Sequence, residues 1–254
     1  MQVTLHDPRT IFTLRHAPSW VLLSMSAGAV NAGGFLACRR FVSHVTGTAT
    51  MISINAHLRE LVFDLGLVMA SFIVGAAVSV LALQGRKRKG QEPWHHAPLI
   101  AVSSILALVA ALGMMGVFGP FGGNVQSTAD VVLLSMLSFS MGLQNASVAT
   151  LTGFMVRTTH LTGPASDLGV YLGTAMVTVG TDRGLALRAA GLRAMKIAAF
   201  IGGAAAMVPA ARALGFGAFI FPAMTVLLAT ALSFVPAWWS SLEGARREAE
   251  PSRA

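Results

Sequence analysis

The short phrase HVTGTA at residues 44–49 returns as HLTGPA at residues 160–165. It is the middle one of three matched pairs that occur in the same order along the chain. The other two pairs are SMSAGAVNA (24–32) with SFSMGLQNA (138–146), and FIVGAA (72–77) with FIGGAA (200–205). The offset between partners rises from 114 to 116 to 128 residues, so the second copy has gained residues. Three matches in one order predict a chain built from two related halves.

The composition places both halves in a membrane. Hydrophobic residues make up 54% of the 254 residues and charged residues only 11%, with a mean hydropathy of +0.68. A soluble domain carries about 25% charged residues, and a membrane-spanning helix needs about 20 apolar residues. The sequence therefore predicts an all-α integral membrane protein with about six transmembrane helices and no sizeable soluble domain. The predicted spans are 18–37, 65–84, 98–119, 131–152, 196–214 and 216–236.

These spans divide evenly between the two copies. We expect an N-terminal segment, a first three-helix repeat, a second three-helix repeat and a tail, at 1–17, 18–119, 131–238 and 239–254. Because each copy has an odd number of spans, the second copy would enter the membrane from the opposite side. The prediction is thus a pair of inverted repeats, an arrangement that recurs in secondary transporters with the substrate site near the midplane.

The segments that follow each H-x-T-G phrase, 47–58 and 164–180, complicate this count. If both crossed the membrane, the halves would be parallel and the RKRK loop at 86–89 would lie outside. That position is contrary to the rule that Lys and Arg gather in cytoplasmic loops. We therefore interpret both segments as short re-entrant or interfacial helices.

The distribution of charge gives an orientation and argues against nucleic acid. With cytoplasmic termini, 14 of the 18 Lys and Arg residues lie inside and 4 outside, as the positive-inside rule requires. The net charge of +8 is thus explained by short loops, and we expect no nucleic-acid partner. The first 20 residues are polar for too long to be a secretory signal. The lone Cys38 cannot form an internal disulfide and indicates no compartment.

The Thr-Gly step in each phrase is typical of a helix start. We expect Thr46 and Thr162 to cap free backbone N–H groups, and Gly47 and Gly163 to allow a close approach by another group. Pro164 suits the first position of a helix. The exposed N–H groups of such helix starts attract anionic or carbonyl groups.

Several polar side chains within apolar sequence are candidates for a binding site, each with a plainer alternative. Asn31, Gln144 and Asn145 would be costly in lipid and should face the protein interior, as helix-to-helix contacts or as substrate ligands. His44 and His160 either satisfy nearby backbone at a break in a helix, or relay protons or bind a ligand.

The remaining residues of interest are one acidic residue, one arginine and a set of small residues. Asp167 is the best acidic candidate for the site, unless it lies solvated at an interface. Arg157 is expected to extend to the inner membrane surface. Ser71, Gly75 and Ser79 recur every fourth residue and predict a small-residue stripe for close helix packing.

The stretches MGLQNA (141–146), VRTTHLTG (156–163) and FVSHVTG (41–47) resemble the YoaK family of bacterial membrane proteins, a domain of unknown function. The resemblance covers about residues 18–238 and implies a protein of the bacterial inner membrane with about six spans. It implies no substrate. This chain has Thr48 where the family usually has Asn, and Asn31 where the family often has Asp. The family's histidine positions accept other residues, which argues against indispensable proton chemistry.

Three functions are compatible with these features. The first is a small secondary transporter or permease, for which a homodimer is one arrangement. Its site would lie between the two helix starts and the spans that carry Asn31 and Asn145. The second is an intramembrane enzyme or metal site built on His44, His160 and Asp167. No HExxH, GxSxG or di-iron Glu-x-x-His pattern occurs, so we expect no enzyme, metal or cofactor. The third is a non-transporting partner or regulator of another membrane protein. We expect lipid and an unknown small molecule or ion as partners.

Overall fold

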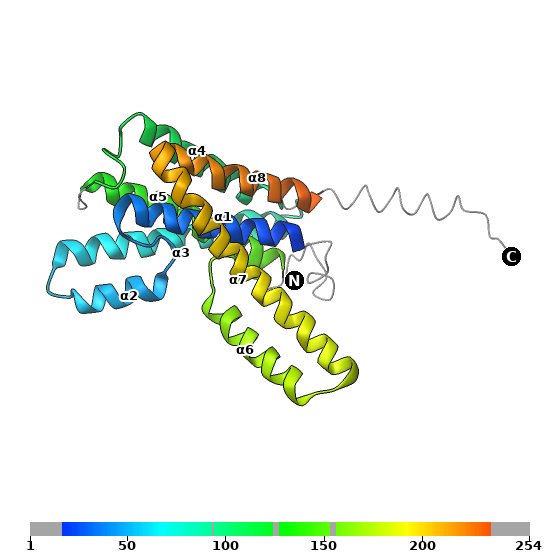
Figure 1. The fold of residues 1–254 in the computed structure, drawn as a ribbon. Coiled ribbons are helices and arrows are strands. Elements are labelled where there is room, and N and C mark those ends of the chain that lie inside the picture. The colour runs from blue at the N-terminus through cyan, green and yellow to red at the C-terminus, as the bar shows by residue number, and fades with distance from the viewer. Residues whose placement is uncertain (1–16, 93, 124–126, 153–155, 235–254) are drawn as a thin grey trace.

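The computed structural model describes residues 17–92, 94–123, 127–152 and 156–234, and every element in these ranges is helical. Figure 1 shows them as a bundle with one long hairpin, α6 and α7, that extends beyond it. The helices are α1 (Ala17–Cys38), α2 (Val45–Ile54), α3 (Arg59–Arg88), α4 (Ala97–Met114), α5 (Thr128–Leu151), α6 (Thr162–Val177), α7 (Gly180–Leu214), the 3-10 helix η1 (Gly215–Phe219) and α8 (Ile220–Phe234).

The long apolar helices confirm an all-α membrane protein. By length and composition, five described segments are able to cross a membrane. The last of them, Gly180–Ser233, comprises two helices, α7 and α8, joined through η1. Each of the six predicted spans therefore corresponds to one helix. In the described ranges, α2 is a shorter apolar helix, and α6 is not among the spanning candidates.

The predicted spans differ from the helices mainly at their ends. The third helix, α3, extends beyond the predicted 65–84 at both ends, and α7 begins at Gly180 rather than near residue 196. The physical reason is that a helix does not stop where its apolar window stops. Charged residues continue the helix, as Arg86, Lys87 and Arg88 do in the last turn of α3. Hydropathy predicts the part of a helix inside lipid, not its full length.

The two halves interlock. The most extensive helix contacts join α3 of the first half to α5 of the second, and α1 of the first half to α7 of the second. The fourth helix, α4, likewise packs against α5 and α8, and α1 packs against α8. Contacts within a half are limited chiefly to α6 with α7 and α2 with α3. The core therefore forms between the halves rather than inside each one.

Glycines at equivalent positions of the repeat make these contacts close. A Cβ atom on Gly28 of α1 would lie 2.0 Å from the Phe200 carbonyl oxygen of α7. A Cβ atom on the equivalent Gly142 of α5 would lie 2.0 Å from the Phe72 carbonyl oxygen of α3. Such spacing brings two helix backbones together, as small residues do in membrane helix pairs. The α1–α7 and α5–α3 pairs thus use the same packing.

The predicted small-residue stripe on α3 takes part in the α3–α5 contact. A Cβ atom on Gly75 would lie 2.2 Å from the Phe139 carbonyl oxygen, and its equivalent Gly203 makes the same approach to Met25, at 1.9 Å. Ser79 is fully buried. The stripe is structural, as predicted.

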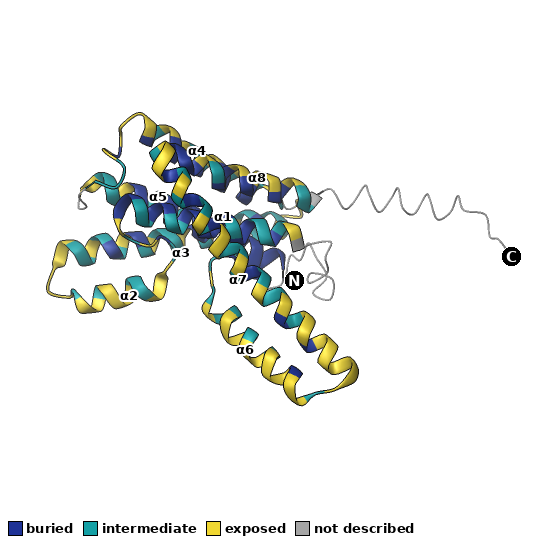
Figure 2. Ribbon diagram, viewed as in Figure 1, coloured by how far each residue is buried: buried dark blue, intermediate teal, exposed yellow. Residues whose placement is uncertain are grey.

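Two short helices remain outside this core. No residue of α2 is buried, and Ala175 is the buried residue of α6. In Figure 2, exposed residues dominate α2 and the outer part of the α6–α7 hairpin, whereas buried residues gather in the bundle. Their exposed side chains include Met51, Ile54, Met176 and Val177. Apolar side chains on such surfaces suit contact with lipid.

Candidate functional site

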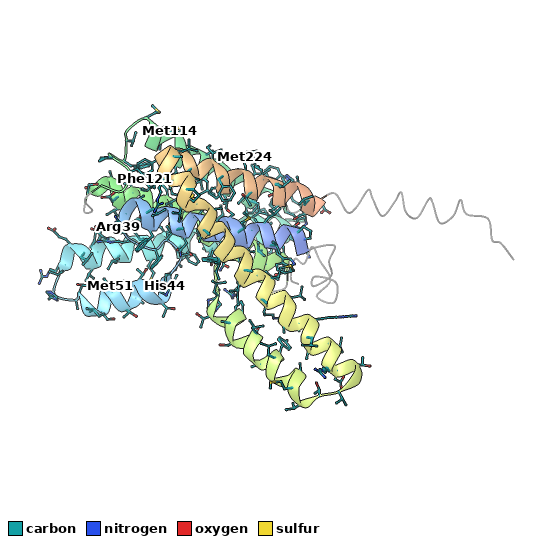
Figure 3. All side chains as sticks on the ribbon, viewed as in Figure 1. Arg39, His44, Met51, Met114, Phe121 and Met224 are labelled. Carbon is teal, nitrogen blue, oxygen red and sulfur yellow. The ribbon has the colours of Figure 1, made fainter. Side chains whose placement is uncertain are left out.

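The first turns of α2 and α6 open onto one cavity. It has a volume of about 450 Å³ and is lined from both halves. In Figure 3, His44 marks the end of α2 that lies toward the bundle. The residues that line this central cavity are Asn31, Ser43, His44, Val45, Thr46, Phe72, Asn145, Arg157, Thr159, His160, Leu161, Thr162 and Phe200. The doubled phrase thus brings its two copies together in space.

Equivalent asparagines anchor the loops that lead into the two helix starts. The Asn31 amide oxygen accepts hydrogen bonds from the backbone N–H groups of Val42 and Ser43, at 3.0 and 3.1 Å, and from the Ser43 hydroxyl at 3.3 Å. The Asn145 amide oxygen accepts from the Thr159 N–H at 3.5 Å, the equivalent position of the second half. Each oxygen is therefore occupied, and the NH₂ end of each side chain is left for the cavity.

The helix starts differ from the prediction in how they are capped. The N-cap residues are His44 for α2 and Leu161 for α6, and neither makes a side-chain cap hydrogen bond. Thr46 and Thr162 lie inside the first turns, so the prediction that they cap the helices is wrong. Pro164 is the third residue of α6 rather than the first. The reason is that the chain turns into the helix before the Thr-Gly step.

This geometry leaves the first N–H groups of both helices free for a ligand. The first helical hydrogen bonds are donated by Thr48 in α2 and Ala165 in α6. The N–H groups before them have no partner within their helix. Together with the aligned peptide dipoles, they make a region that attracts negative charge.

The glycine of each phrase makes room for the histidine. A Cβ atom on Gly47 would lie 2.6 Å from Nδ1 of His44, and one on Gly163 would lie 3.3 Å from Cδ2 of His160. Both imidazole rings thus pack over the first helical turn. This contact gives the H-x-T-G spacing a structural reason, with His and Gly as a packed pair.

Two of the predicted site residues, Gly47 and Gln144, line neither of the cavities described for this site. Gln144 is fully buried, and its Nε2 group donates to the Leu23 carbonyl and the Thr158 hydroxyl, both at 3.0 Å. These bonds tie α5 to α1 and to the segment that precedes α6. Gln144 does not line the central cavity. The structure gives it the alternative role that was left open, as a contact between helices.

A smaller cavity of about 140 Å³ adjoins the central one and shares Arg157 and His160 with it. Gly163 and Asp167 line this second cavity and not the central one. Asp167 forms an ion pair with Arg193, at 3.5 Å between Oδ2 and Nε. Its carboxylate is therefore partly neutralised within the protein.

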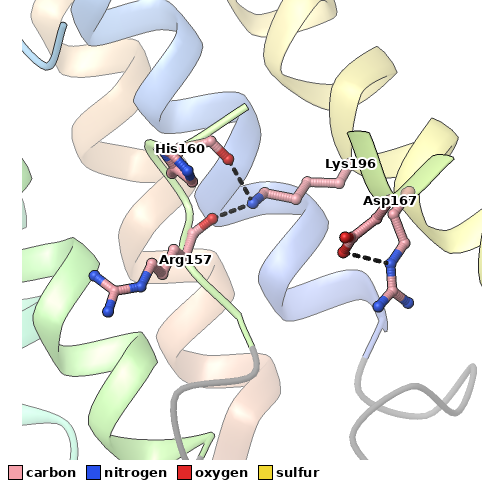
Figure 4. A network of polar contacts seen from close by, with 5 residues as sticks. Arg157, His160, Asp167 and Lys196 are labelled. Atoms are coloured by element: carbon pink, nitrogen blue, oxygen red, sulfur yellow. Dashed lines mark hydrogen bonds and ion pairs between the residues drawn. The ribbon is translucent and has the colours of Figure 1, made fainter. Parts of the chain in front are cut away.

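A buried lysine holds the segment that leads into α6. The Lys196 ammonium group donates hydrogen bonds to the backbone carbonyl oxygens of Arg157 and His160, the latter at 2.9 Å. Figure 4 shows these bonds, with the Arg157 guanidinium pointing away from Lys196 and Asp167. The backbone of Arg157 is thus fixed, while its side chain extends toward the central cavity.

The charged residues at this site have uncharged counterparts in the first half of the repeat. Arg157 occupies the position of Phe41 in the first half, Lys196 that of Val68, and Asp167 that of Met51. Of the three, Lys196 is buried, whereas Arg157 and Asp167 are exposed. Because a buried charge is costly, the appearance of Lys196 in only one copy indicates a role beyond the shared scaffold. Sequence reasoning missed Arg157 and Lys196 as site residues. A comparison of the two copies position by position would have found them.

The central cavity is electrostatically one-sided. Among the described residues that line it, there is no Asp or Glu, and Arg157 contributes a full positive charge. In the described ranges, no group of three or more His, Cys, Asp or Glu side chains is placed to hold a metal ion. The site thus offers N–H donors, two imidazoles and one guanidinium.

The sequence comparisons agree with the resemblance noted above. No curated protein and no solved structure matches the chain. The family described as "Protein of unknown function (DUF1275)", to which the YoaK proteins belong, matches residues 19–232, which is most of the chain and includes the whole central cavity. The chain therefore belongs to the DUF1275 family.

Proposed function

We propose that this protein is a small secondary transporter or permease of a bacterial inner membrane, with both termini in the cytoplasm. Its substrate site is the central cavity, near the membrane midplane. One observation carries the proposal, namely that equivalent helix starts from the two halves, α2 and α6, open onto the same cavity. Transporters built from repeats place broken helices and their free N–H groups at such a position.

The inverted arrangement of the repeats is part of this proposal. It is supported by the odd number of long helices in each half and by the concentration of Lys and Arg in one set of connections. In Figure 1, α1 and α5, the first helices of the two halves, run in opposite directions. An inverted pair of halves gives two related conformations, open to either side, at little cost in new contacts.

The interlocked packing is compatible with movement of one unit against another. Helix α1 packs mainly on α7, and α5 mainly on α3, whereas α1 and α5 contact each other much less. The two tight pairs are thus candidates for rigid units that move relative to each other. Alternating access in repeat-built transporters is largely such a rigid-body movement.

The Thr hydroxyls of the two phrases provide a clean test. Thr46 and Thr162 line the cavity, and their hydroxyls make no hydrogen bond to another described residue. Thr46→Val and Thr162→Val therefore change the cavity without breaking an internal contact. Thr174→Val is the matched control, since Thr174 lies on α6 outside the cavity and its hydroxyl only bonds the Val170 carbonyl.

The experiment is uptake into proteoliposomes that contain the full chain, with a panel of organic acids, inorganic anions and nucleobase-like solutes. We expect uptake of at least one solute, reduced about tenfold or more in the Thr46→Val, Thr162→Val double variant and unchanged in Thr174→Val. Folded protein that moves no solute faster than empty liposomes would refute the proposal. Equal uptake by the double variant would refute the location of the site.

A further inference from the structure

The chemistry of the central cavity points to a class of ligand, and this inference rests on the proposed function. The first feature is positive potential without a counter-charge. The free N–H ends of α2 and α6 and the Arg157 side chain all border the cavity. Arg157 forms no ion pair with a described residue. A guanidinium in this position is stabilised by an anion, and its planar donors match a carboxylate.

A second, independent observation is the state of Asn145. This side chain is only 7% exposed and lines the cavity. Its amide oxygen accepts from the Thr159 N–H, but its Nδ2 group has no hydrogen-bond partner in the described part of the chain. The Nδ2 atom also keeps some exposed surface and is therefore not fully enclosed by protein. The donor is therefore open to the cavity, and an unpaired buried donor requires an acceptor from a ligand or water.

The third feature is an apolar wall built from equivalent residues. Phe72 of α3 and Phe200 of α7 occupy the same position of the repeat, and both line the cavity. Val45 and Leu161, the residues before the two Thr-Gly steps, add aliphatic surface. A hydrated inorganic ion gains nothing from these side chains, whereas an organic group buries apolar area against them.

From these three features we infer that the central cavity binds a small organic carboxylate whose apolar body lies against Phe72 and Phe200. The carboxylate accepts hydrogen bonds from Arg157, from Asn145 Nδ2 and from the first N–H groups of α2 and α6. The volume of about 450 Å³ falls within the range of small-molecule sites.

The probes separate charge from shape. Benzoate and benzamide have the same ring and nearly the same size but differ in charge, and inorganic phosphate has charge without an apolar body. Binding of each to the full purified chain in lipid nanodiscs is measured by isothermal titration calorimetry. We expect benzoate to bind at least tenfold more tightly than benzamide or phosphate. Equal affinity for benzoate and benzamide, or tighter binding of phosphate, would overturn the inference.

Variants locate the binding. Arg157→Gln should weaken benzoate binding about tenfold or more. Arg157→Lys keeps the charge but loses the planar donors, so its affinity for benzoate should lie between those of wild type and Arg157→Gln. Arg183→Gln is the matched control because Arg183 is exposed on α7 and lies outside both cavities. Since the Arg157 side chain makes no bond to a described residue, its removal should leave folding intact. Unchanged benzoate affinity in folded Arg157→Gln would overturn the inference.

Uptake measured on the same samples keeps the two proposals apart. Binding of benzoate without uptake of any solute would refute transport and leave the ligand class standing. Uptake of a neutral or cationic solute that is unaffected by Arg157→Gln would support transport and refute the carboxylate. The two failures are therefore distinguishable.

Discussion

Replacing Gly203 by Ala should destabilise the protein, whereas the same change at the neighbouring Gly202 should not. A Cβ atom at position 203 would lie 1.9 Å from the Met25 carbonyl oxygen of α1, and ordinary contact begins near 3.4 Å. The obstructing atom belongs to backbone and cannot rotate away. Helices α1 and α7 would therefore have to separate by about 1.5 Å at this point.

The size of the effect follows from what that separation disturbs. The α1–α7 pair is one of the two most extensive contacts in the fold, and inserting a methyl group into a close-packed interface costs about 1–3 kcal/mol. We expect Gly203→Ala to lie near the upper end of that range. A Cβ atom at Gly202 meets nothing within 4 Å, and Gly→Ala in a helix stabilises by about 0.5–1 kcal/mol. The two variants should thus differ by about 3–4 kcal/mol.

The chain contains its own reporter for this measurement. Cys38 is the single cysteine and is fully buried at the end of α1. Its reaction with a fluorescent maleimide, followed during heating of the full chain in detergent micelles, reports unfolding. Gly203→Ala should become reactive at a clearly lower temperature than wild type, and Gly202→Ala at the same or a higher one.

The repeat supplies an independent check. Gly75 is the equivalent of Gly203 and would place its Cβ atom 2.2 Å from the Phe139 carbonyl oxygen. Gly75→Ala should therefore cost a similar amount, with Gly66→Ala as the control, because a Cβ atom at Gly66 meets nothing within 4 Å. If Gly203→Ala and Gly75→Ala were as stable as their controls, the close packing of the two helix pairs would be refuted.

Three further predictions concern the segments around the cavity. Asn31→Ala removes three hydrogen bonds to the loop before α2, so the melting temperature should fall, by an amount that corresponds to about 1–3 kcal/mol; an unchanged temperature would contradict the anchoring role. Gly47→Ala should lower the thermal stability in micelles more than Gly163→Ala, because the nearest histidine ring atom lies 2.6 Å rather than 3.3 Å from the new methyl group; equal effects would show that the ring moves freely. Lys196→Met removes both hydrogen bonds that the ammonium group donates to the segment before α6, so tryptic cleavage after Arg157 should become faster than in wild type. An unchanged cleavage rate would show that other contacts hold the segment.

Hydropathy predicted the long helices because burial in lipid requires about 20 apolar residues wherever a helix crosses. It did not predict the early start of α7. Arg183 and Arg188 lie before the predicted span 196–214, but they belong to the same helix as that span. A charged residue near a span is equally compatible with a loop and with the end of a long helix. The choice depends on a partner, which here is α6.

Part of the lining of the central cavity was predictable where the repeat supplied a second copy. Asn31 and Asn145 were expected to lie near the two H-x-T-G phrases, and they line the same cavity. The sequence did not distinguish the role of Gln144 from that of Asn31 and Asn145. A lone amide in an apolar helix is compatible with a ligand or with a contact to another helix, and only the position of the Leu23 carbonyl decides. The hydroxyl caps were predicted wrongly because Thr-Gly fits the first turn of a helix as well as its N-cap.

The cavity combines a symmetric part with an asymmetric one, and the two parts have different consequences. The helix starts, the asparagines and the phenylalanines come in equivalent pairs from the two halves. By themselves they would give a ligand no preference between the α2 end and the α6 end of the cavity. Arg157 comes from one half, where its counterpart is Phe41. A single guanidinium displaces the most favourable position of an anion toward α6. Because Lys196 fixes the backbone of Arg157, this asymmetry is built into the fold and does not depend on the ligand. Substitution of Arg157 therefore removes the guanidinium charge from the site, whereas substitution of its counterpart Phe41, which is not among the residues that line the cavity, leaves that charge in place.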